Sequence, residues 1–473
     1  MKVGKPKLRV LITNWSLASR GGSELYVRDL AFALLKLGHT PIVYSTELGK
    51  VAKEIREVTI PVVDNLATIS TPPDVIHGQH YDETMTALLR FPGVPAIYVC
   101  HDWYTWFDKP PRFPRILRYV AVDQTCYDKL VYESAIATER VRLLLNFVDL
   151  ERFKARASLP AQPKRLLVFG NQTQEFPHLA ALRKACEGAG LTLDALGTDV
   201  GKPCDHPEDV LGQYDIVLAK GRAALEALAA GTAVIPYFER SLGPLVTADR
   251  LDHLLTHNLG ARTMTCEPEP DAFAQALLRE IGRYDPKDAA IVCERVRGMC
   301  GRDRAADEFI SLYEGVIAEY KNREPPDVNA EGLAAASHLR ELVLSIKKER
   351  ATLQDENRQL LLAHDSLRFQ MEETERARQA YAEHLSAQLS DTQVQLSVKE
   401  TELTSIKNER NMLSDQLSTK DAQLTRINTS LGWHLLNSYG RIKYRYLLPV
   451  YRTLGLSRYI TVGRSRSQQS GDD

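Results

Sequence analysis

Short apolar runs rich in β-branched residues alternate with helical patterns from residue 8 to about residue 320. The runs that predict β-strands are LRVLIT (8–13), TPIVYS (40–45), DVIHG (74–78), PAIYVC (95–100), YVAVD (119–123), RLLVFG (165–170), DIVLAK (215–220) and TAVIPYF (232–238). Alternation on this scale is typical of parallel sheets with helices on both faces. The pattern therefore predicts an α/β fold over this part of the chain.

Apolar residues follow a different period further along the chain. The alternation ends at Glu324-Pro-Pro-Asp, because proline interrupts both helices and strands, and we predict a linker over residues 323–334. Beyond it, leucine and isoleucine recur at heptad spacing among Glu, Lys, Arg and Gln, which predicts a coiled coil over residues 335–430. The core positions are Leu339, Leu342, Ile346, Leu353, Leu360 and Leu367, then Leu389, Leu396, Leu403, Leu417, Leu424 and Leu431 with Ile406, Leu413 and Ile427.

The heptad pattern has one discontinuity. Leu367 and Leu389 are three heptads plus one residue apart, so the seam shifts its register near Tyr381. Arg410 occupies a core position and weakens the coil locally. Leucines at heptad spacing on both sides of the shift favour self-association over a single solvated helix or a disordered charged linker. The pattern does not distinguish a dimer from a trimer.

The last segment, residues 431–473, mixes aromatic and basic residues. Its aromatic residues are Trp433, Tyr439, Tyr444, Tyr446, Tyr451 and Tyr459, and its basic residues are Arg441, Lys443, Arg445, Arg452, Arg458, Arg464 and Arg466. Such a mixture suits the headgroup region of an anionic bilayer, where each cation contributes about 1 kcal/mol. The alternatives are a helical cap that folds back on the coil and an RNA-binding tail.

Composition places the chain among soluble globular proteins. The 473 residues are 44% hydrophobic and 26% charged, which is enough for two or three domains with cores of their own. A net charge of -1 gives no overall field that indicates nucleic acid binding. The seven cysteines form no C-x-x-C pair, and their odd number argues against a secreted disulfide framework. No apolar run reaches the ~18 residues of a membrane span, and LRVLIT is too short for a signal peptide. We therefore expect a cytoplasmic protein, peripheral on the inner face of the membrane if the tail binds lipid.

Residues 215–238 form one strand-helix-strand step with a glycine-led turn. The turn leaves backbone N–H groups at a helix N-terminus, which is a site that suits a phosphate. Glu226 follows Arg222 by one helical turn and so lies on the same face. A carboxylate in that place is positioned for a ribose diol. The alternative is an ordinary βαβ unit with an exposed glutamate.

The segment EALAAGTAV resembles the EAxxxGxPV element of retaining GT-B glycosyltransferases of the family 4 type, in which that glutamate holds the ribose of a nucleotide-sugar donor. The resemblance implies a donor site. Its implied residues are Gly21, Gly22, Asn171, Lys220, Gly221, Arg222, Ala223 and Glu226.

Two glycines follow the first predicted strand, in Gly21-Gly22-Ser23-Glu24. A strand, a glycine pair and a helix start let the backbone approach a ligand closely. The segment resembles the GGxE loop of the same family, which lies by the donor phosphates and the acceptor. The resemblance implies a catalytic role for Gly22 and an acceptor-side role for Ser23 and Glu24, whereas the alternative makes Ser23 a simple N-cap.

Histidines stand at the ends of two predicted strands. His77 and His80 lie in or after DVIHG, and His101-Asp102 follows PAIYVC. Ligands of open α/β sheets bind at the carboxyl ends of strands. His101 matches the position at which the family keeps a catalytic histidine beside the sugar, while His77, His80 and Asp102 match acceptor-side positions. The alternative is a structural hydrogen-bonding histidine, and no glutamate stands at metal-ligand spacing.

The segment Arg142-LLLNFVDLERF resembles the IPNGVDxxxF hinge of the family, with Asn146 and Asp149 matching and Phe147 in place of glycine. Four elements, namely Gly21-Gly22-Ser23-Glu24, His101-Asp102, this hinge segment and EALAAG, occur in the same order as in the family. They predict a GT-B fold with two Rossmann-like domains, residues 1–150 and 151–322, an interdomain cleft, and a last helix that can pack back on the first domain. The tail also resembles the S-x-x-W-R-L ends of some bacterial polysaccharide glycosyltransferases, with His434 in place of arginine.

The chain departs from the family at the donor site. No Arg or Lys follows the strand RLLVFG in residues 171–178, where the family has a pair of cations for the pyrophosphate. The family's first acidic residue falls on Leu218. Lys220 and Arg222 lie by the helix N-terminus and are candidates to supply the missing charge. Otherwise the donor site is degenerate.

The resemblance implies transfer of a sugar from a nucleoside diphosphate sugar to a hydroxyl of a glycan or lipid-linked glycan with retention, without a cofactor or an essential metal. Surface polysaccharide synthesis fits such a reaction. One alternative is a catalytically degenerate scaffold that acts through its coiled coil and tail. Another is a sugar-nucleotide epimerase, whose catalytic acids we do not find. A dinucleotide-binding interpretation fails because G-x-G-x-x-G is absent after the first strand.

Overall fold

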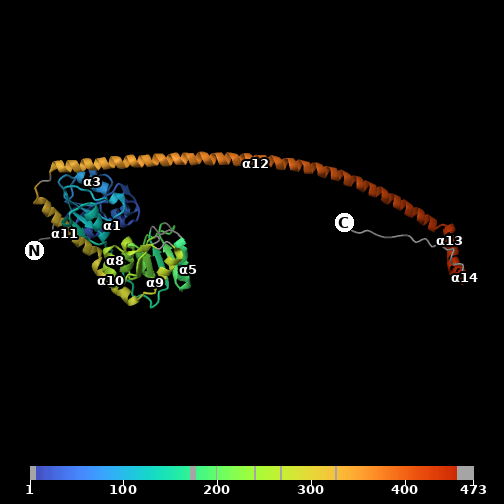
Figure 1. The fold of residues 1–473 in the computed structure, drawn as a ribbon, viewed down its shortest axis with the longest axis horizontal. Coiled ribbons are helices and arrows are strands. Elements are labelled where there is room, and N and C mark those ends of the chain that lie inside the picture. Colours follow the sequence, from blue (N-terminus) through green and yellow to red (C-terminus); the bar gives the residue numbers. More distant parts are fainter. Residues whose placement is uncertain are drawn as a thin grey trace. The chain divides into compact units, whose positions relative to one another are not determined.

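The computed structural model describes residues 7–170, 177–198, 200–238, 241–266, 269–324 and 327–454. The chain divides into two units, residues 1–348 and 349–473. The first unit holds two α/β domains (Figure 1).

The first domain is built on a seven-stranded sheet. Its strands are β1 (Arg9–Thr13), β3 (Thr40–Tyr44), β5 (Val62–Val63), β6 (Val75–Gln79), β7 (Ala96–Cys100), β8 (Ile116–Ala121) and β9 (Val141–Leu143). The order is β5-β3-β1-β6-β7-β8-β9, and every pair is parallel. The short strands β2 (Ser16–Leu17) and β4 (Glu47–Leu48) pair separately. All carboxyl ends of the large sheet therefore meet at one edge.

Helices cover both faces of this sheet. They are α1 (Gly22–Lys36), α2 (Lys50–Glu57), α3 (Tyr81–Arg90) and α4 (Gln124–Asp128), with short turns η1 (Leu66–Thr68), η2 (Trp106–Asp108), η3 (Lys129–Glu133) and η4 (Thr138–Arg140). The last helix of the α/β region, α11 (Arg302–Lys321), also packs here, and its residues Phe309 and Tyr313 belong to the core of the first domain. Its buried residues recur at three- and four-residue spacing, which gives one apolar stripe that must be covered.

The second domain has a six-stranded sheet in the order β11-β10-β12-β13-β14-β15. The strands are β10 (Arg165–Phe169), β11 (Thr192–Leu196), β12 (Ile216–Ala219), β13 (Ala233–Phe238), β14 (Ser241–Leu242) and β15 (Thr265–Cys266). The first four are parallel, and β14 and β15 are antiparallel. The helices are α5 (Pro177–Gly188), α6 (Pro207–Val210), α7 (Gly221–Ala229), α8 (Leu251–Thr256), α9 (Pro270–Ile281) and α10 (Pro286–Met299), with η5 (Leu211–Gln213) and η6 (Ala261–Thr263).

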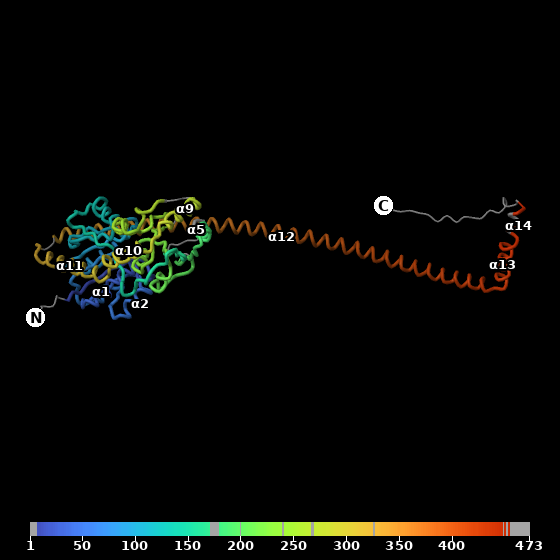
Figure 2. The backbone as a smooth tube through the Cα atoms, turned by 90° about the horizontal axis from the view of Figure 1, so that it is seen from below, coloured from blue at the N-terminus to red at the C-terminus, as the bar shows by residue number. Residues whose placement is uncertain are grey.

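Alternate residues of the second sheet build separate cores on its two faces. Leu167 and Val217 pack with α7, α8 and α10. Leu166 and Ile216 pack with α5 and α9, which lie next to each other in Figure 2. Successive side chains of a strand point to opposite faces, so a fully apolar strand supplies both cores.

Each predicted run contains a strand, and the predicted α/β class is confirmed. The pattern missed β11, whose sequence TLDAL includes two polar residues, and the short β9. Both strands lie at a sheet edge, where a continuous apolar run is not needed.

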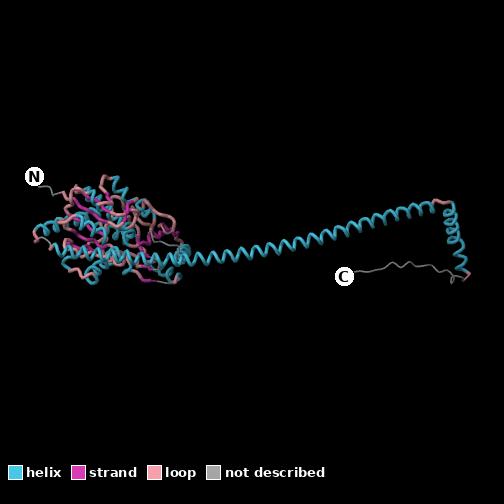
Figure 3. The backbone as a smooth tube through the Cα atoms, turned by 90° about the horizontal axis from the view of Figure 1, so that it is seen from above, coloured by secondary structure: helices cyan, strands magenta, loops and turns pink. Residues whose placement is uncertain are grey.

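One helix, α12, runs from Val328 to Asn428 (Figure 3). The helix begins inside residues 323–334, so the linker predicted over that range is too long. Asp327 caps the start, because its Oδ1 accepts the backbone N–H of Asn329 at 2.9 Å. The alanine-rich sequence that follows has high helix propensity. His338 is the one buried residue among those described in this helix, and it lies against Tyr81 of the first domain with ring centroids 5.3 Å apart.

From Leu353 onward, the heptad leucines of α12 are exposed to solvent. Leu360 is 69% exposed and Leu396 is 59% exposed. Beyond α12 the chain forms α13 (Leu431–Ile442), η7 (Lys443–Leu447) and α14 (Leu448–Thr453), and residues 455–473 of the predicted tail lie outside the described residues. Within the described part of the chain, no helix is long and apolar enough to span a membrane.

Candidate functional site

The predicted site residues of the first domain lie at the carboxyl edge of its sheet. Gly21 and Gly22 come after β1 and the short β2, His80 follows β6 and His101 follows β7. Across from them, α7 begins directly after β12 of the second domain. Strand ends and a helix N-terminus are where open α/β sheets bind their ligands.

The glycine pair lies at the start of α1. Gly21 is the N-cap, and the side chain of Glu24 folds back over it, so that a Cβ on Gly21 would lie 2.3 Å from Glu24 Oε2. Ser23 is not the N-cap, because it lies inside α1, and its hydroxyl donates to Glu24 Oε2 at 3.0 Å. Burial raises the pKa of Glu24. A side chain at position 21 would therefore displace the carboxyl group of Glu24 from this place.

Arg222 joins the two domains in a buried ion cluster. Its Nε donates to Glu226 Oε1 at 2.8 Å, one turn along α7, and its Nη2 donates to Asp29 Oδ2 of α1. The side chain of Arg222 is 11% exposed, that of Glu226 is 5% exposed and that of Asp29 is 1% exposed. The face shared by Arg222 and Glu226 thus meets the first domain.

The charges in this cluster shift each other's protonation. Burial raises the pKa of Glu226, and Arg222 opposes this shift only in part. Burial also acts to raise the pKa of Asp29, but Arg222 and Arg28 outweigh it and hold that pKa below its usual value. Asp29 is therefore ionised beside Arg222 at neutral pH.

Further arginines surround the cluster. Arg28 binds Asp29 Oδ1 through Nε at 2.8 Å and binds Glu54 Oε2 through Nη1 at 2.9 Å. Arg152 donates to Glu208 Oε2 at 2.7 Å, and its Nη1 is buried without a partner among the described residues. These guanidinium groups gather at the domain boundary, and each of them is paired with a carboxylate.

The turn before α7 needs its glycine. Gly221 has a φ of +55°, which strains any residue with a Cβ. Lys220 precedes it as the N-cap, with its Nζ 3.1 Å from the ring centroid of Phe238. Ala223 is half-buried, and Asn171 lies outside the described residues.

The chain crosses between the domains twice at the predicted hinge. Val148 N donates to Cys300 O at 2.8 Å and Arg302 N donates to Val148 O at 2.9 Å, so both crossings lie side by side. Asn146 Nδ2 donates to Asn258 Oδ1 at 3.1 Å. Asp149 accepts a hydrogen bond from Arg302 at the start of α11. Both predicted hinge residues thus bind parts of the second domain and the returning helix.

His101 is held by the loop that follows it. Asp108 Oδ2 accepts the backbone N–H groups of His101, at 2.6 Å, and of Asp102. The ring of His101 lies edge-on to Tyr26 of α1, with centroids 4.6 Å apart. Burial lowers the pKa of His101 well below its usual value, so the ring is neutral at pH 7.

The other two histidines have partners inside the first domain. His77 Nδ1 lies 2.6 Å from the hydroxyl of Tyr313 on α11, and burial lowers its pKa to about 3. His80 Nδ1 accepts the backbone N–H of Trp15 at 2.9 Å, and burial lowers its pKa to about 4. Both histidines therefore make structural hydrogen bonds within the first domain.

The structure brings together His101, Arg222 and Glu226, because Arg222 is paired with Glu226 and is near enough to His101 to act on its pKa. Asp102 lies in the loop that follows β7. Sequence reasoning missed Tyr26 and Asp29. They are three residues apart on α1, on a face that is otherwise apolar. The sequence signal for Asp29 was a carboxylate at a helix position where the pattern otherwise places apolar residues.

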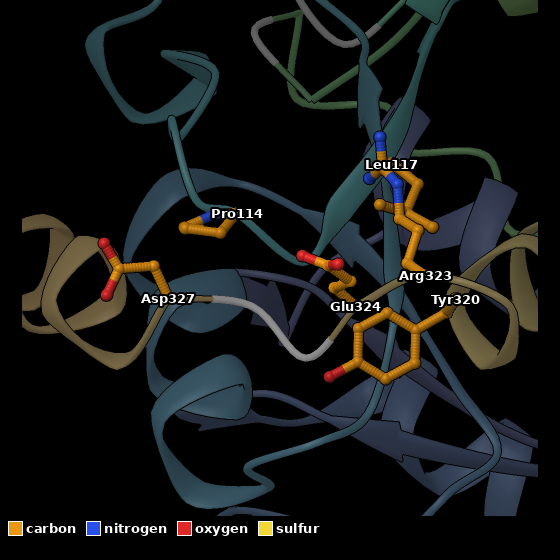
Figure 4. Close-up of a pocket in the computed structure, with 6 residues that line it drawn as sticks. All are labelled: Pro114, Leu117, Tyr320, Arg323, Glu324 and Asp327. Atoms are coloured by element: carbon orange, nitrogen blue, oxygen red, sulfur yellow. The ribbon is translucent and has the colours of Figure 1, made fainter.

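A surface pocket of about 310 Å³ lies elsewhere in the described chain (Figure 4). It is lined by Pro114, Leu117, Tyr320, Arg323, Glu324 and Asp327, and it contains none of the predicted site residues. Within the described ranges, no group of three or more His, Cys, Asp or Glu is placed to hold a metal ion.

Residues 20–152 match the family model of Glycosyltransferase Family 4, a range that includes Gly21, His101 and Asp149. The fold is similar to a solved glycosyltransferase from Rickettsia africae ESF-5, with a TM-score of 0.50 and 14% identity over 67% of this chain and 100% of that chain. Together with the two sheets, this likeness shows a GT-B fold.

Two other solved structures are more distant. A putative UDP-N-acetylglucosamine 2-epimerase from Listeria monocytogenes has a TM-score of 0.42 and 12% identity over 68% of this chain and 100% of that chain. The catalytic domain of starch synthase IV from Arabidopsis thaliana has a TM-score of 0.42 and 11% identity over 66% of this chain and 100% of that chain. No curated protein matches the sequence.

Proposed function

We propose that this protein is a glycosyltransferase that moves a sugar from a nucleoside diphosphate sugar to a hydroxyl of a glycan or lipid-linked glycan, with retention. The observation that carries the proposal is the placement of Arg222 and Glu226 at the start of α7, facing α1 and close to His101. The match of residues 20–152 to Glycosyltransferase Family 4 supports it.

The donor diphosphate would lie at the N-terminus of α7, where backbone N–H groups point outward. Arg222 is paired with Asp29 as well as Glu226, so a diphosphate would compete with these carboxylates for its guanidinium group. Arg152, with an unpartnered Nη1, is near enough to Asp29 and Glu226 to affect the pKa of both. These two arginines are our candidates for the cations missing after β10.

Glu226 would then accept hydrogen bonds from the ribose hydroxyls. The diphosphate is a good leaving group, so stabilising its developing charge is the main catalytic task and we propose no cofactor. Movement of the domains about Asn146 and Asp149 would admit the donor and then exclude water.

We also propose that α12 pairs with a second copy of the chain and that the segment from Leu431 onward contacts an anionic membrane. The exposed leucines of α12 support the first proposal. In α13, Trp433 and Tyr439 are exposed beside Arg441, which supports the second. A lipid-linked acceptor in surface polysaccharide synthesis would suit both.

One observation favours the alternative of a catalytically degenerate scaffold. Arg222 already has a carboxylate on each side, so the charge that it offers is largely neutralised in this structure. In that case the buried cluster would serve only to hold the domains together.

Binding of nucleoside diphosphates by the full-length chain decides between the two. We expect one of UDP, GDP, CDP, ADP or dTDP to raise the melting temperature, since a ligand at a hundred times its Kd stabilises by about 2.7 kcal/mol. Glu226→Gln should weaken that nucleotide roughly tenfold to a hundredfold, because a hydrogen bond to a charged group contributes roughly 1.5–3 kcal/mol.

Glu308→Gln is the matched control, since Glu308 forms the same kind of helical pair with Arg304 on an exposed face. It should leave nucleotide binding unchanged. If none of the five nucleotides stabilises the wild-type chain, the transferase proposal is wrong and the scaffold stands.

A further inference from the structure

Polar atoms without partners gather on one face of the first sheet. Among the described residues, Tyr26 Oη, both amide atoms of Gln79 and His101 Nε2 are buried and make no hydrogen bond. Tyr26 is 3% exposed and Gln79 is 0% exposed. Buried polar groups of folded proteins are nearly always hydrogen-bonded, so a cluster of exceptions indicates a missing partner.

The sheet register explains why these groups share a face. Gln79 of β6 is paired with Val99 of β7, and side chains at paired positions point to the same side. His101 comes two residues after Val99, so its side chain lies on the same side of the sheet as that of Gln79. Tyr26 reaches the same place from α1, with its ring 4.6 Å from the ring of His101.

The chemistry of this cluster differs from that of the ion cluster beside it. Burial lowers the pKa of His101 and raises the pKa of Tyr26, which leaves both side chains neutral around pH 7. A phenol, a carboxamide and a neutral imidazole supply both donors and acceptors. Sugar hydroxyls also donate and accept, whereas a phosphate only accepts.

The neutral cluster adjoins the proposed diphosphate site. Phe147 contacts both, with its ring centroid 4.7 Å from that of Tyr26 and 6.0 Å from Arg222 Cζ. Phe147 stands where the related hinge has glycine, so its ring bounds the space between the two clusters.

We propose that Tyr26 and Gln79 bind hydroxyl groups of the transferred sugar, beside His101. The inference rests on the proposed function and deepens it, because it divides the donor between two sets of residues. The charged set binds the nucleoside diphosphate and the neutral set binds the sugar.

Tyr26→Phe tests the inference, because it removes only the hydroxyl group. The probes are the five free nucleoside diphosphates and the glucose, galactose and mannose esters of whichever of them binds, measured by calorimetry on the full-length chain. We expect the variant to bind one ester about tenfold more weakly, since a good hydrogen bond corresponds to roughly a factor of ten. Its affinity for the free nucleotide should be unchanged.

Tyr119→Phe is the matched control. Tyr119 is as deeply buried as Tyr26, but its hydroxyl donates to Pro111 O at 2.7 Å. The control should lower the melting temperature and leave all ligands unaffected, whereas Tyr26→Phe should leave the melting temperature unchanged or raised. A removed hydroxyl without a protein partner costs no hydrogen bond.

Four results would overturn the inference. A loss of stability in Tyr26→Phe equal to that of the control would show that the hydroxyl has a partner in the folded chain. Equal weakening of nucleotide and ester, or weakening of neither, would remove Tyr26 from the sugar site while the proposed function stands. Failure of every nucleotide to bind the wild type would reject the proposed function and this inference together.

Discussion

The boundary between the two domains and the long helix α12 break the usual rule of burial in opposite directions. At the boundary, charged and polar side chains such as Asp29, Glu226 and Gln79 are buried, and that of Arg222 is only 11% exposed. Along α12, leucines such as Leu360 and Leu396 are exposed. Buried charges and long exposed apolar seams are both unfavourable unless something pairs with them.

The difference indicates two kinds of partner. The buried groups are few, differ in chemistry and converge from separate elements, which is typical of a site for a small polar ligand. The leucines repeat with one spacing along a single helix, and only a surface with the same repeat can cover them. Each of the following predictions changes one side of this comparison.

The largest effect is expected on α12. The double substitution Leu396→Ala and Leu403→Ala removes two apolar contacts from each helix of the proposed pair, and each buried leucine truncation costs about 2–5 kcal/mol. Self-association should weaken by more than a hundredfold, measured by sedimentation equilibrium of the full-length chain.

Thr401→Ala is the control, since Thr401 lies between these leucines in sequence but off the heptad seam. It should leave association unchanged. A wild-type chain that remains monomeric at every concentration would show that α12 stands alone or binds a different protein.

The next effect concerns the buried arginine. Arg222→Ala leaves Asp29 without its partner in the second domain, and breaking a buried ion pair costs roughly 3–5 kcal/mol. The free energy of unfolding, measured with urea, should fall by that amount. Arg304→Ala removes the equivalent i, i+4 pair from an exposed face and should cost less than about 1 kcal/mol. Equal losses in the two variants would mean that the cluster is not buried in solution.

The smallest effect is on pH dependence. His77 and His80 have folded-state pKa values of about 3 and about 4, below the ordinary 6.5. Below pH 6.5, these histidines therefore bind more protons in the unfolded chain than in the folded chain. Their contribution to the free energy of unfolding is complete above pH 6.5 and is lost as the pH falls to about 4 for His80 and about 3 for His77. Each histidine should contribute a slope of about 1.4 kcal/mol per pH unit in this window.

His77→Gln should remove one such slope between pH 6.5 and 5, measured by urea unfolding at several pH values. His364→Gln is the control, because His364 is exposed on α12. A slope that is the same in wild type and His77→Gln would show that His77 is not held neutral by burial.

Much of the fold was available from periodic patterns. The alternation of short apolar runs and helices predicted the strands from β1 to β13, apart from β9, β11 and the short edge and paired strands, because parallel strands covered on both faces must be apolar throughout. Heptad spacing likewise indicated the long helix, although its start at Val328 was missed. Local spacing alone specifies such features.

The candidate site was predictable only in part. Gly21 and His101 were proposed because they stand at a turn and at a strand end, which a sequence marks with glycine and with the end of an apolar run. Glu226 was proposed because the segment EALAAGTAV around it resembles a family element. Asp29 and Tyr26 were missed because they lie inside a regular helix, where their spacing resembles that of any core residue.

The sequence by itself determined which segments are strands and helices, since backbone periodicity is set by neighbours a few residues away. Only the tertiary structure decided that Arg222 meets Asp29, 193 residues earlier in the chain, and that Tyr313 of α11 meets His77. Those contacts depend on how two domains and a returning helix pack together. Packing of that kind is governed by shape and burial over the whole unit, which no local pattern records.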